Sequence, residues 1–166
     1  MHTNLEETKD WNRVAEFYAE RARGGVGLMV TGGIAPNREG GVFASAAGLY
    51  NDDDIANHKV VTDRVHDAGG KIAMQILHAG RYAYSPECVG PSPVKSPISP
   101  FPPKELDEDG IEKQISDIAA TAARARRAVE RVLRLGRHPL ELRPRAVQHA
   151  AGRRMHEDEI VRATKV

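Results

Sequence analysis

Two apolar stretches of this chain each carry residues that could do chemistry. Gly32 and Gly33 follow the apolar run 26–31, and Gln75 lies inside a second apolar run at 71–78. Glycine lets a ligand approach the backbone closely, but the more ordinary interpretation of the pair is a tight turn. A glutamine amide donates and accepts in one plane, which suits a heterocycle edge carrying N–H and C=O groups. The alternative for Gln75 is a buried amide that neighbouring backbone groups satisfy.

The second apolar run is followed by a polar turn. His78 and Arg81 flank Gly80 there, so the turn either binds an anion or ties the strand end to the next loop. The seven histidines and one cysteine show no metal-ligand spacing, and we predict no metal site. No phosphate-binding loop and no nucleophile elbow is present, so we assign no catalytic residue.

These residues need strands and helices to position them. Short, nearly continuous apolar runs at 26–31 and 71–78 predict strands buried on both faces. Amphipathic spacing predicts helices over 10–23 and about 53–68, and a third helix beginning at Asp107. This alternation predicts parallel βα units, whose ligands lie at the carboxyl ends of the strands.

Each predicted helix has an apolar face that should pack inward. The expected inward residues are Trp11, Val14, Ala15, Phe17, Tyr18 and Ala22 in the first helix, Ile55, Val60, Val61 and Val65 in the second, and Ile111, Ile115, Ile118, Ala119 and Ala122 in the third. Between the second strand and the third helix, residues 85–103 hold seven prolines. Proline is excluded from helix interiors and central strands, so we expect an ordered excursion or lid there.

Size and composition limit the classes of protein. The 166 residues carry a net charge of +1, which argues against a dedicated nucleic-acid binder. The chain is too short for a complete (β/α)8 barrel, which needs about 250 residues. A single cysteine excludes an internal disulfide framework. The sequence shows no signal peptide and no apolar run long enough for a membrane span, so we expect a soluble cytoplasmic protein.

The charge is distributed unevenly along the chain. Residues 1–123 contain 12 basic and 18 acidic side chains, a net charge of −6. Residues 124–166 contain 12 basic and 5 acidic side chains, a net charge of +7. Such asymmetry marks either a basic tail that binds acidic partners or a stretch of different origin.

Three segments carry a resemblance to a known family. They are Met1-His2-Thr3, FYAERARGGVGLMVTGGIAP at 17–36 and GGKIAMQILHAGRY at 69–82. Over about residues 1–126 the chain resembles the old yellow enzyme family of flavin oxidoreductases, and most closely the bacterial 2,4-dienoyl-CoA reductases.

The resemblance implies an FMN-binding (β/α)8 barrel that reduces an activated C=C bond of a small-molecule substrate with electrons from NAD(P)H. It places Met1 and His2 at the end of the first barrel strand, where they contact the flavin. Gly33 matches a backbone contact to FMN, and Gln75 matches the glutamine that hydrogen-bonds the flavin pyrimidine ring. Hydrogen bonds there tune the potential of a flavin. The iron–sulfur cluster of longer relatives has no counterpart in this chain.

The chain departs from the family at both ends. Met1 matches the end of the first barrel strand, and the tyrosine-bearing motif expected after the third helix is absent. We therefore predict an α/β fold that is an incomplete (β/α)8 barrel, lacking its first strand and divergent in its C-terminal part. The predicted parts are residues 1–126, from the FMN-binding barrel, and an Arg-rich tail at 127–166. The tail reads either as a shifted frame near 124–130 or as a helix continuing to Gly136 and a basic extension.

Two functions follow from these features. The first is a truncated FMN-dependent ene-reductase whose activity is in doubt, with exposed strand edges that predict marginal stability. The alternative is a non-catalytic interaction protein whose basic tail binds acidic partners.

Overall fold

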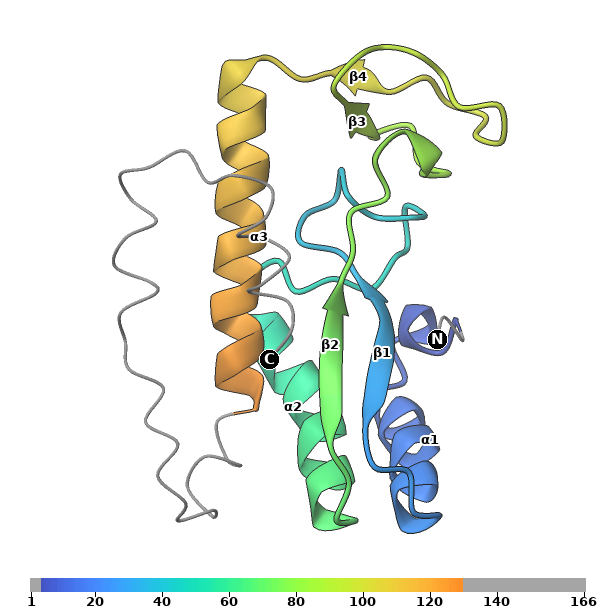
Figure 1. Ribbon diagram of the computed structural model, residues 1–166, viewed down its shortest axis with the longest axis vertical. Coiled ribbons are helices and arrows are strands. Elements are labelled where there is room, and N and C mark those ends of the chain that lie inside the picture. Colours follow the sequence, from blue (N-terminus) through green and yellow to red (C-terminus); the bar gives the residue numbers. More distant parts are fainter. Residues whose placement is uncertain (1–3, 130–166) are drawn as a thin grey trace. The chain divides into compact units, whose positions relative to one another are not determined.

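The computed structural model describes residues 4–129, in which strands and helices alternate as the sequence predicts. Two two-stranded parallel sheets and three α-helices build this part of the chain (Figure 1). The elements in order are the 3-10 turn η1 (Glu6–Thr8), α1 (Trp11–Arg23), β1 (Met29–Ile34), α2 (Asp53–Asp67), β2 (Ile72–Ile76), the 3-10 turn η2 (Gly80–Tyr82), the short strands β3 (Val89–Gly90) and β4 (Lys104–Glu105), and α3 (Glu108–Ala128).

The helix ends follow from local capping. The Asp10 side chain accepts a hydrogen bond from the backbone N–H of Arg13, and Asp107 does the same for Gly110. Each carboxylate thus satisfies an N–H group that the first turn of a helix leaves unpaired. Gly25 follows α1 with a φ of +90°, a left-handed conformation that favours glycine. The predicted helix boundaries are therefore confirmed to within a residue or two.

The sheet consists of β1 and β2 in parallel, with one irregularity. Val30 pairs with Ala73 and Gly33 pairs with Gln75, so β1 has one more residue than β2 between these pairs. This extra residue makes a β-bulge, which bends the strand locally. The prediction that Gly32 and Gly33 form a turn after the strand is wrong, because both lie within β1. The glycines serve the bulge instead.

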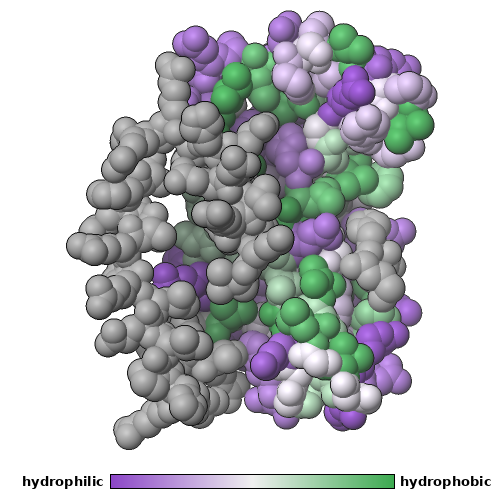
Figure 2. Space-filling view, in the orientation of Figure 1, coloured by the Kyte–Doolittle hydropathy of each residue, from purple (hydrophilic) through white to green (hydrophobic). Residues whose placement is uncertain are grey.

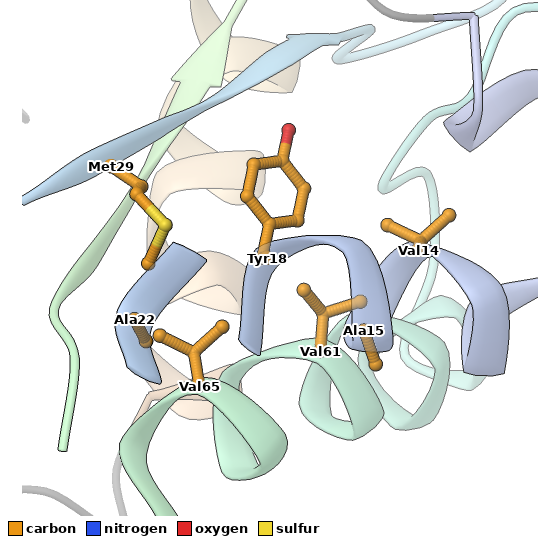
Figure 3. Close-up of a cluster of buried hydrophobic side chains, with 7 residues drawn as sticks. All are labelled: Val14, Ala15, Tyr18, Ala22, Met29, Val61 and Val65. Carbon is orange, nitrogen blue, oxygen red and sulfur yellow. The ribbon is translucent and has the colours of Figure 1, made fainter. Parts of the chain in front are cut away.

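The main hydrophobic core lies between the sheet and the first two helices. Met29 of β1 packs against Tyr18 and Ala22 of α1 and Val65 of α2 (Figure 3). Ile72 of β2 lies against the same cluster. The inward residues predicted for α1 are buried or half-buried, so that prediction is confirmed. On α2 Val61 and Val65 are buried, whereas Val60 is exposed and was assigned to the wrong face.

A second cluster extends this core along the strands. Ile34 of β1 and Met74 of β2 pack with Ile55 of α2 and Ala125 of α3. All three α-helices therefore contact one face of the sheet. Its other face carries Val30, which is 46% exposed. Figure 2 shows hydrophobic surface over the strands, and no described element covers it. The prediction of strands buried on both faces is wrong for the described residues.

Helix α3 presents a different face to the protein from the one expected. Ile111, Ile115 and Ile118 are exposed, as are Ala119 and Ala122. The buried residues of α3 are instead Gln114, Thr121 and Ala128. The Thr121 hydroxyl lies within hydrogen-bond distance of the carbonyls of Pro36 and Leu49, which explains how a polar residue is buried there. The hydrophobic spacing located the amphipathic helix but not the face that the described residues cover.

Residues 85–103 form the predicted excursion between β2 and α3. Short strands β3 and β4 pair in parallel across its base. The Ser99 hydroxyl donates to the carbonyl of Ala83 at 2.6 Å, which ties the loop to the end of η2. Within the described residues helix α3 spans Glu108–Ala128. The alternative of a helix continuing to Gly136 falls on residues outside the described part. Most of the tail predicted at 127–166, including its alternative origins, lies outside the described residues.

Candidate functional site

The structure brings together two of the four predicted cofactor-binding residues. Gly33 and Gln75 are direct partners across the parallel β1–β2 pair. They come from separate βα units, and both lie towards the carboxyl ends of their strands. Met1 and His2 lie outside the described residues, so their assignment stays a prediction.

Gln75 is exposed, whereas the sequence suggested a buried amide within an apolar strand. Side chains alternate along a strand, and Met74 packs towards the helices, so Gln75 projects from the face that the helices do not cover. Within the described residues its side-chain amide makes no hydrogen bond. It thus presents free donor and acceptor groups from the bare face of the sheet.

The bulge in β1 is held by a side chain that the sequence reasoning missed. Thr31 is buried, and its Oγ1 accepts a hydrogen bond from the backbone N–H of Gln75 at 3.0 Å. The same hydroxyl donates to the carbonyl of Gly32 at 2.7 Å. A bulge leaves backbone groups without ladder partners, and this hydroxyl replaces one of them. The position of Gln75 therefore depends on Thr31.

A buried carboxyl group lies beneath the bulge on the helix side. Glu6 of η1 is 3% exposed and accepts hydrogen bonds from the Tyr18 hydroxyl at 2.8 Å and from the backbone N–H of Gly32 at 3.2 Å. Burial, together with the hydrogen bond to Glu6, raises the pKa of Tyr18 well above its usual value. The phenol is therefore held as a neutral donor.

Both bulge glycines lie where a side chain would make an unusually tight contact. A Cβ on Gly32 would lie 3.1 Å from a carboxylate oxygen of Glu6. A Cβ on Gly33 would lie 3.0 Å from two side-chain carbons of Leu77. The Gly-Gly pair is thus explained by contacts within this chain, although not by the tight turn that was the more ordinary of the two interpretations. The backbone of Gly33 still lies beside Gln75.

A polar cluster closes the carboxyl end of the sheet. Gln114 of α3 accepts from the Asn37 side chain at 2.6 Å and donates to Glu39 at 2.6 Å. His78 Nε2 lies 3.1 Å from the same Gln114 oxygen. The backbone N–H of Gly80 donates to His78 Nδ1 at 3.1 Å, so Nε2 carries the ring proton and donates to Gln114. His78 therefore has a structural role, but it ties the strand end to α3 rather than to the next loop as considered above.

The charge state of this cluster follows from its surroundings. Burial lowers the pKa of His78, which favours the neutral ring that its two hydrogen bonds require. Lys113 pairs with Glu39 at 2.9 Å and with Asp117 at 2.8 Å. The Gln114 amide, Lys113 and Asp117 all belong to α3, so its polar face, rather than its apolar face, fixes the loops. Nothing in the hydrophobic pattern marked Asn37 or Gln114 as members of this cluster.

Arg81 is the other residue predicted in the turn. Its guanidinium donates to the Tyr82 hydroxyl at 3.2 Å and forms no ion pair within the described part of the chain. It thus remains available for an anion. Over residues 4–129 no three or more His, Cys, Asp or Glu side chains converge to hold a metal ion. No helix in that same range is long and apolar enough to cross a membrane.

The sequence matches the model of a known protein family. Residues 1–130 match the model of the NADH:flavin oxidoreductase / NADH oxidase family. The chain belongs to this family. The resemblance to old yellow enzymes seen in the sequence is thereby confirmed, and the family consists of oxidoreductases.

Similar curated proteins of this flavin oxidoreductase family are enzymes several times longer than the matched segment. A metal reductase from Desulforamulus reducens is 37% identical over 121 residues, which cover 70% of this chain and 18% of the relative. An NADPH dehydrogenase from Listeria welshimeri is 34% identical over 112 residues, covering 67% of this chain and 33% of the relative. The matched segment thus spans a third or less of these relatives.

Solved structures are similar to the described part of the chain in fold. Morphinone reductase, in a mutant complexed with tetrahydroNAD, matches with a TM-score of 0.63 and 25% identity, over 72% of this chain and 37% of that one. A 2-naphthoyl-CoA reductase bound to 2-naphthoyl-CoA matches with a TM-score of 0.66 and 27% identity, over 71% and 20%. An old yellow enzyme homologue from Zymomonas mobilis gives 0.61 and 29%, over 70% and 36%. These neighbours are TIM barrels, and the described residues form a partial α/β unit.

Proposed function

We propose that this chain carries one part of the FMN site of a flavin-dependent ene-reductase. The observation that supports this most directly is the pairing of Gly33 with Gln75 on the face of the sheet that the helices leave bare. In a (β/α)8 barrel that face is the interior, and ligands bind where its strands end. We further propose that the βα units of the described residues are consecutive βα units of such a barrel.

The residues present fit a flavin. The free amide of Gln75 can donate to a ring carbonyl and accept from a ring N–H, as the pyrimidine edge of an isoalloxazine requires. The backbone of Gly33 lies beside it without a side chain to obstruct the approach. Met1 and His2 would add contacts at the end of the preceding strand. When bound, FMN supplies hydride transfer, and the protein supplies orientation and hydrogen bonding.

The proposed reaction is reduction of an activated C=C bond with electrons from NAD(P)H. The similar proteins include NADPH dehydrogenases and a reductase complexed with an aromatic CoA thioester. We propose a 2,4-dienoyl-CoA-like thioester as the substrate, which agrees with the thioester ligand of that neighbour. The described residues contain no side chain that we assign as the proton donor, so turnover by this chain alone is expected to be weak.

The test is an FMN titration of the purified chain, followed by quenching of flavin fluorescence. Saturable binding is expected, and Gln75→Ala should weaken it about tenfold, the effect of losing roughly 1.4 kcal/mol of hydrogen bonding. Asn12→Ala is the matched control, because Asn12 is an exposed amide on α1, away from the bare face. Equal effects of the two variants, or no binding at all, would remove the support for this function.

A further inference from the structure

The exposed aromatic side chains of this protein gather at one place. The sequence contains eight aromatic residues, all of them within the described part. Only Phe43, Tyr82 and Tyr84 are exposed, at 39%, 50% and 44%. All three lie on the loops that follow β1 and β2, on the carboxyl side of the sheet. Exposed apolar groups that cluster in this way mark an interaction site more often than scattered ones do.

Backbone pairing fixes these rings relative to one another. The loops after β1 and β2 stay together beyond the sheet, because Ala79 N–H donates to the Gly40 carbonyl at 2.9 Å and Tyr84 N–H donates to the Val42 carbonyl at 2.7 Å. The rings of Phe43 and Tyr84 stack with centroids 5.8 Å apart and planes 28° from parallel. The pair is therefore built by two βα units together.

Tyr82 joins the same surface through its place in the chain. Ala83 between the two tyrosines is extended and fully buried. Tyr82 and Tyr84 stand on either side of it and are both exposed. We call the exposed side chains of Phe43, Tyr82 and Tyr84 the aromatic platform.

The cationic side chain of Arg81 lies beside Tyr82 of the aromatic platform. The Arg81 guanidinium lies 5.2 Å from the centre of the Tyr82 ring and donates to its hydroxyl. No carboxylate among residues 4–129 forms an ion pair with it. A guanidinium held by stacking and a neutral hydroxyl keeps its remaining N–H groups for an anion, and phosphate oxygens match their geometry.

We propose that the aromatic platform and Arg81 bind the adenosine diphosphate moiety of a nucleotide ligand. The purine ring stacks on Phe43 and Tyr84, and Arg81 takes a phosphate. An uncharged planar ligand would use the rings and leave the guanidinium without a partner. A simple anion would use Arg81 and leave the rings exposed. A purine nucleotide uses both.

This inference rests on the proposed function for the source of the moiety. Nicotinamide dinucleotides and coenzyme A thioesters both carry adenosine diphosphate, and the proposed reaction uses one of each. The platform lies beyond Gln75 along the same strand and loop. A ligand anchored there by its adenosine end can extend its reactive end towards the bare face of the sheet.

Binding of adenosine diphosphate itself tests the proposal, by calorimetric titration of the full chain without FMN. Saturable binding is expected, and Tyr84→Ala should weaken it about tenfold, since stacking of a base on an aromatic ring contributes roughly 1–3 kcal/mol. Tyr84→Phe keeps the ring and should bind like the parent. Arg81→Gln should weaken adenosine diphosphate several-fold while leaving adenosine unchanged, and Arg13→Gln on α1 is its matched control.

Competition experiments identify the source of the moiety and separate this proposal from the flavin site. If NADPH but not coenzyme A displaces bound adenosine diphosphate, the platform binds the reductant. If coenzyme A but not NADPH displaces it, the platform binds the thioester substrate. Gln75→Ala should weaken the binding of FMN without changing the binding of adenosine diphosphate. Tyr84→Ala should weaken the binding of adenosine diphosphate without changing that of FMN. Absence of adenosine diphosphate binding, or equal losses for Tyr84→Ala and Tyr84→Phe, overturns the platform. Adenosine diphosphate binding without FMN binding overturns the proposed function instead.

Discussion

The backbone N–H of Gln75 donates to the side-chain Oγ1 of Thr31 across the two central strands, at 3.0 Å. This contact joins the bulge of β1 to the residue that we assign to the flavin. Because the hydroxyl stands in for a missing ladder partner, the orientation of Gln75 depends on a side chain of the neighbouring strand.

Replacing Thr31 by valine keeps its shape and removes the hydroxyl. The N–H of Gln75 then lacks an acceptor, and we expect the free energy of unfolding to fall by about 1–3 kcal/mol. Thr31→Ser retains the acceptor and should recover most of this loss. Urea denaturation measures both variants. A Thr31→Val protein as stable as the parent would show that the hydroxyl does not support the bulge.

The buried pair beneath the bulge gives a second prediction. Tyr18→Phe removes the hydroxyl that donates to Glu6 at 2.8 Å and leaves the ring in the core. We expect a loss of about 1–3 kcal/mol in thermal or chemical unfolding. Phe17→Leu is a suitable comparison, since Phe17 is half-buried and packs at the edge of the same cluster with a side chain that has no hydrogen-bonding group. The two variants separate the polar contact from the packing.

Stability should depend on pH through His78. Burial lowers its pKa in the folded protein, so the unfolded chain binds a proton more readily. This contribution is fully present above the ordinary histidine pKa of about 6.5 and is lost as pH falls towards the lower folded value. His78→Asn keeps an acceptor for the Gly80 N–H and removes the titration. Thermal melts across this acidic range should show a shallower pH dependence for the variant, and an unchanged slope would contradict the assignment.

Exposed and buried apolar side chains should contribute differently to stability, as Ile115 of α3 and Val65 of α2 can show. Ile115→Gln changes an exposed side chain, and we expect the stability of the folded chain to change by less than about 0.5 kcal/mol. Val65→Ala removes buried carbons from the core and should cost about 2 kcal/mol. Denaturation curves of the two single variants measure both changes in the free energy of unfolding. A large loss for Ile115→Gln would mean that the exposed face is covered in solution.

The sequence predicted the elements well because local signals determine them. Asp10 and Asp107 stand where a helix needs an acceptor for its first N–H groups, and glycines mark two of the helix ends. The apolar runs located both strands within a few residues. The alternation of strands and helices was enough to predict that the two strands are parallel neighbours, whereas the pairing of Gly33 with Gln75 depends also on the bulge in β1.

The sequence predicted burial less well because burial depends on what covers each face. Gln75 sits in an apolar strand and is nonetheless exposed, since all three helices pack on the opposite face. Ile111 and Ile118 form a regular apolar stripe, yet the described residues cover the polar side of α3 instead. Thr31 was overlooked because its role depends on a bulge, and a bulge depends on the register between strands rather than on one strand alone.

The most direct test of the central claim is an amide NMR spectrum of the isotope-labelled chain during titration with FMN. The account predicts saturable shifts of the backbone signals of Gly33 and Gln75 and of the side-chain amide of Gln75, with the signals of Asn12 unchanged. Shifts confined to Tyr82 and Tyr84, or no saturable shift at Gln75, would contradict the assignment of the flavin site.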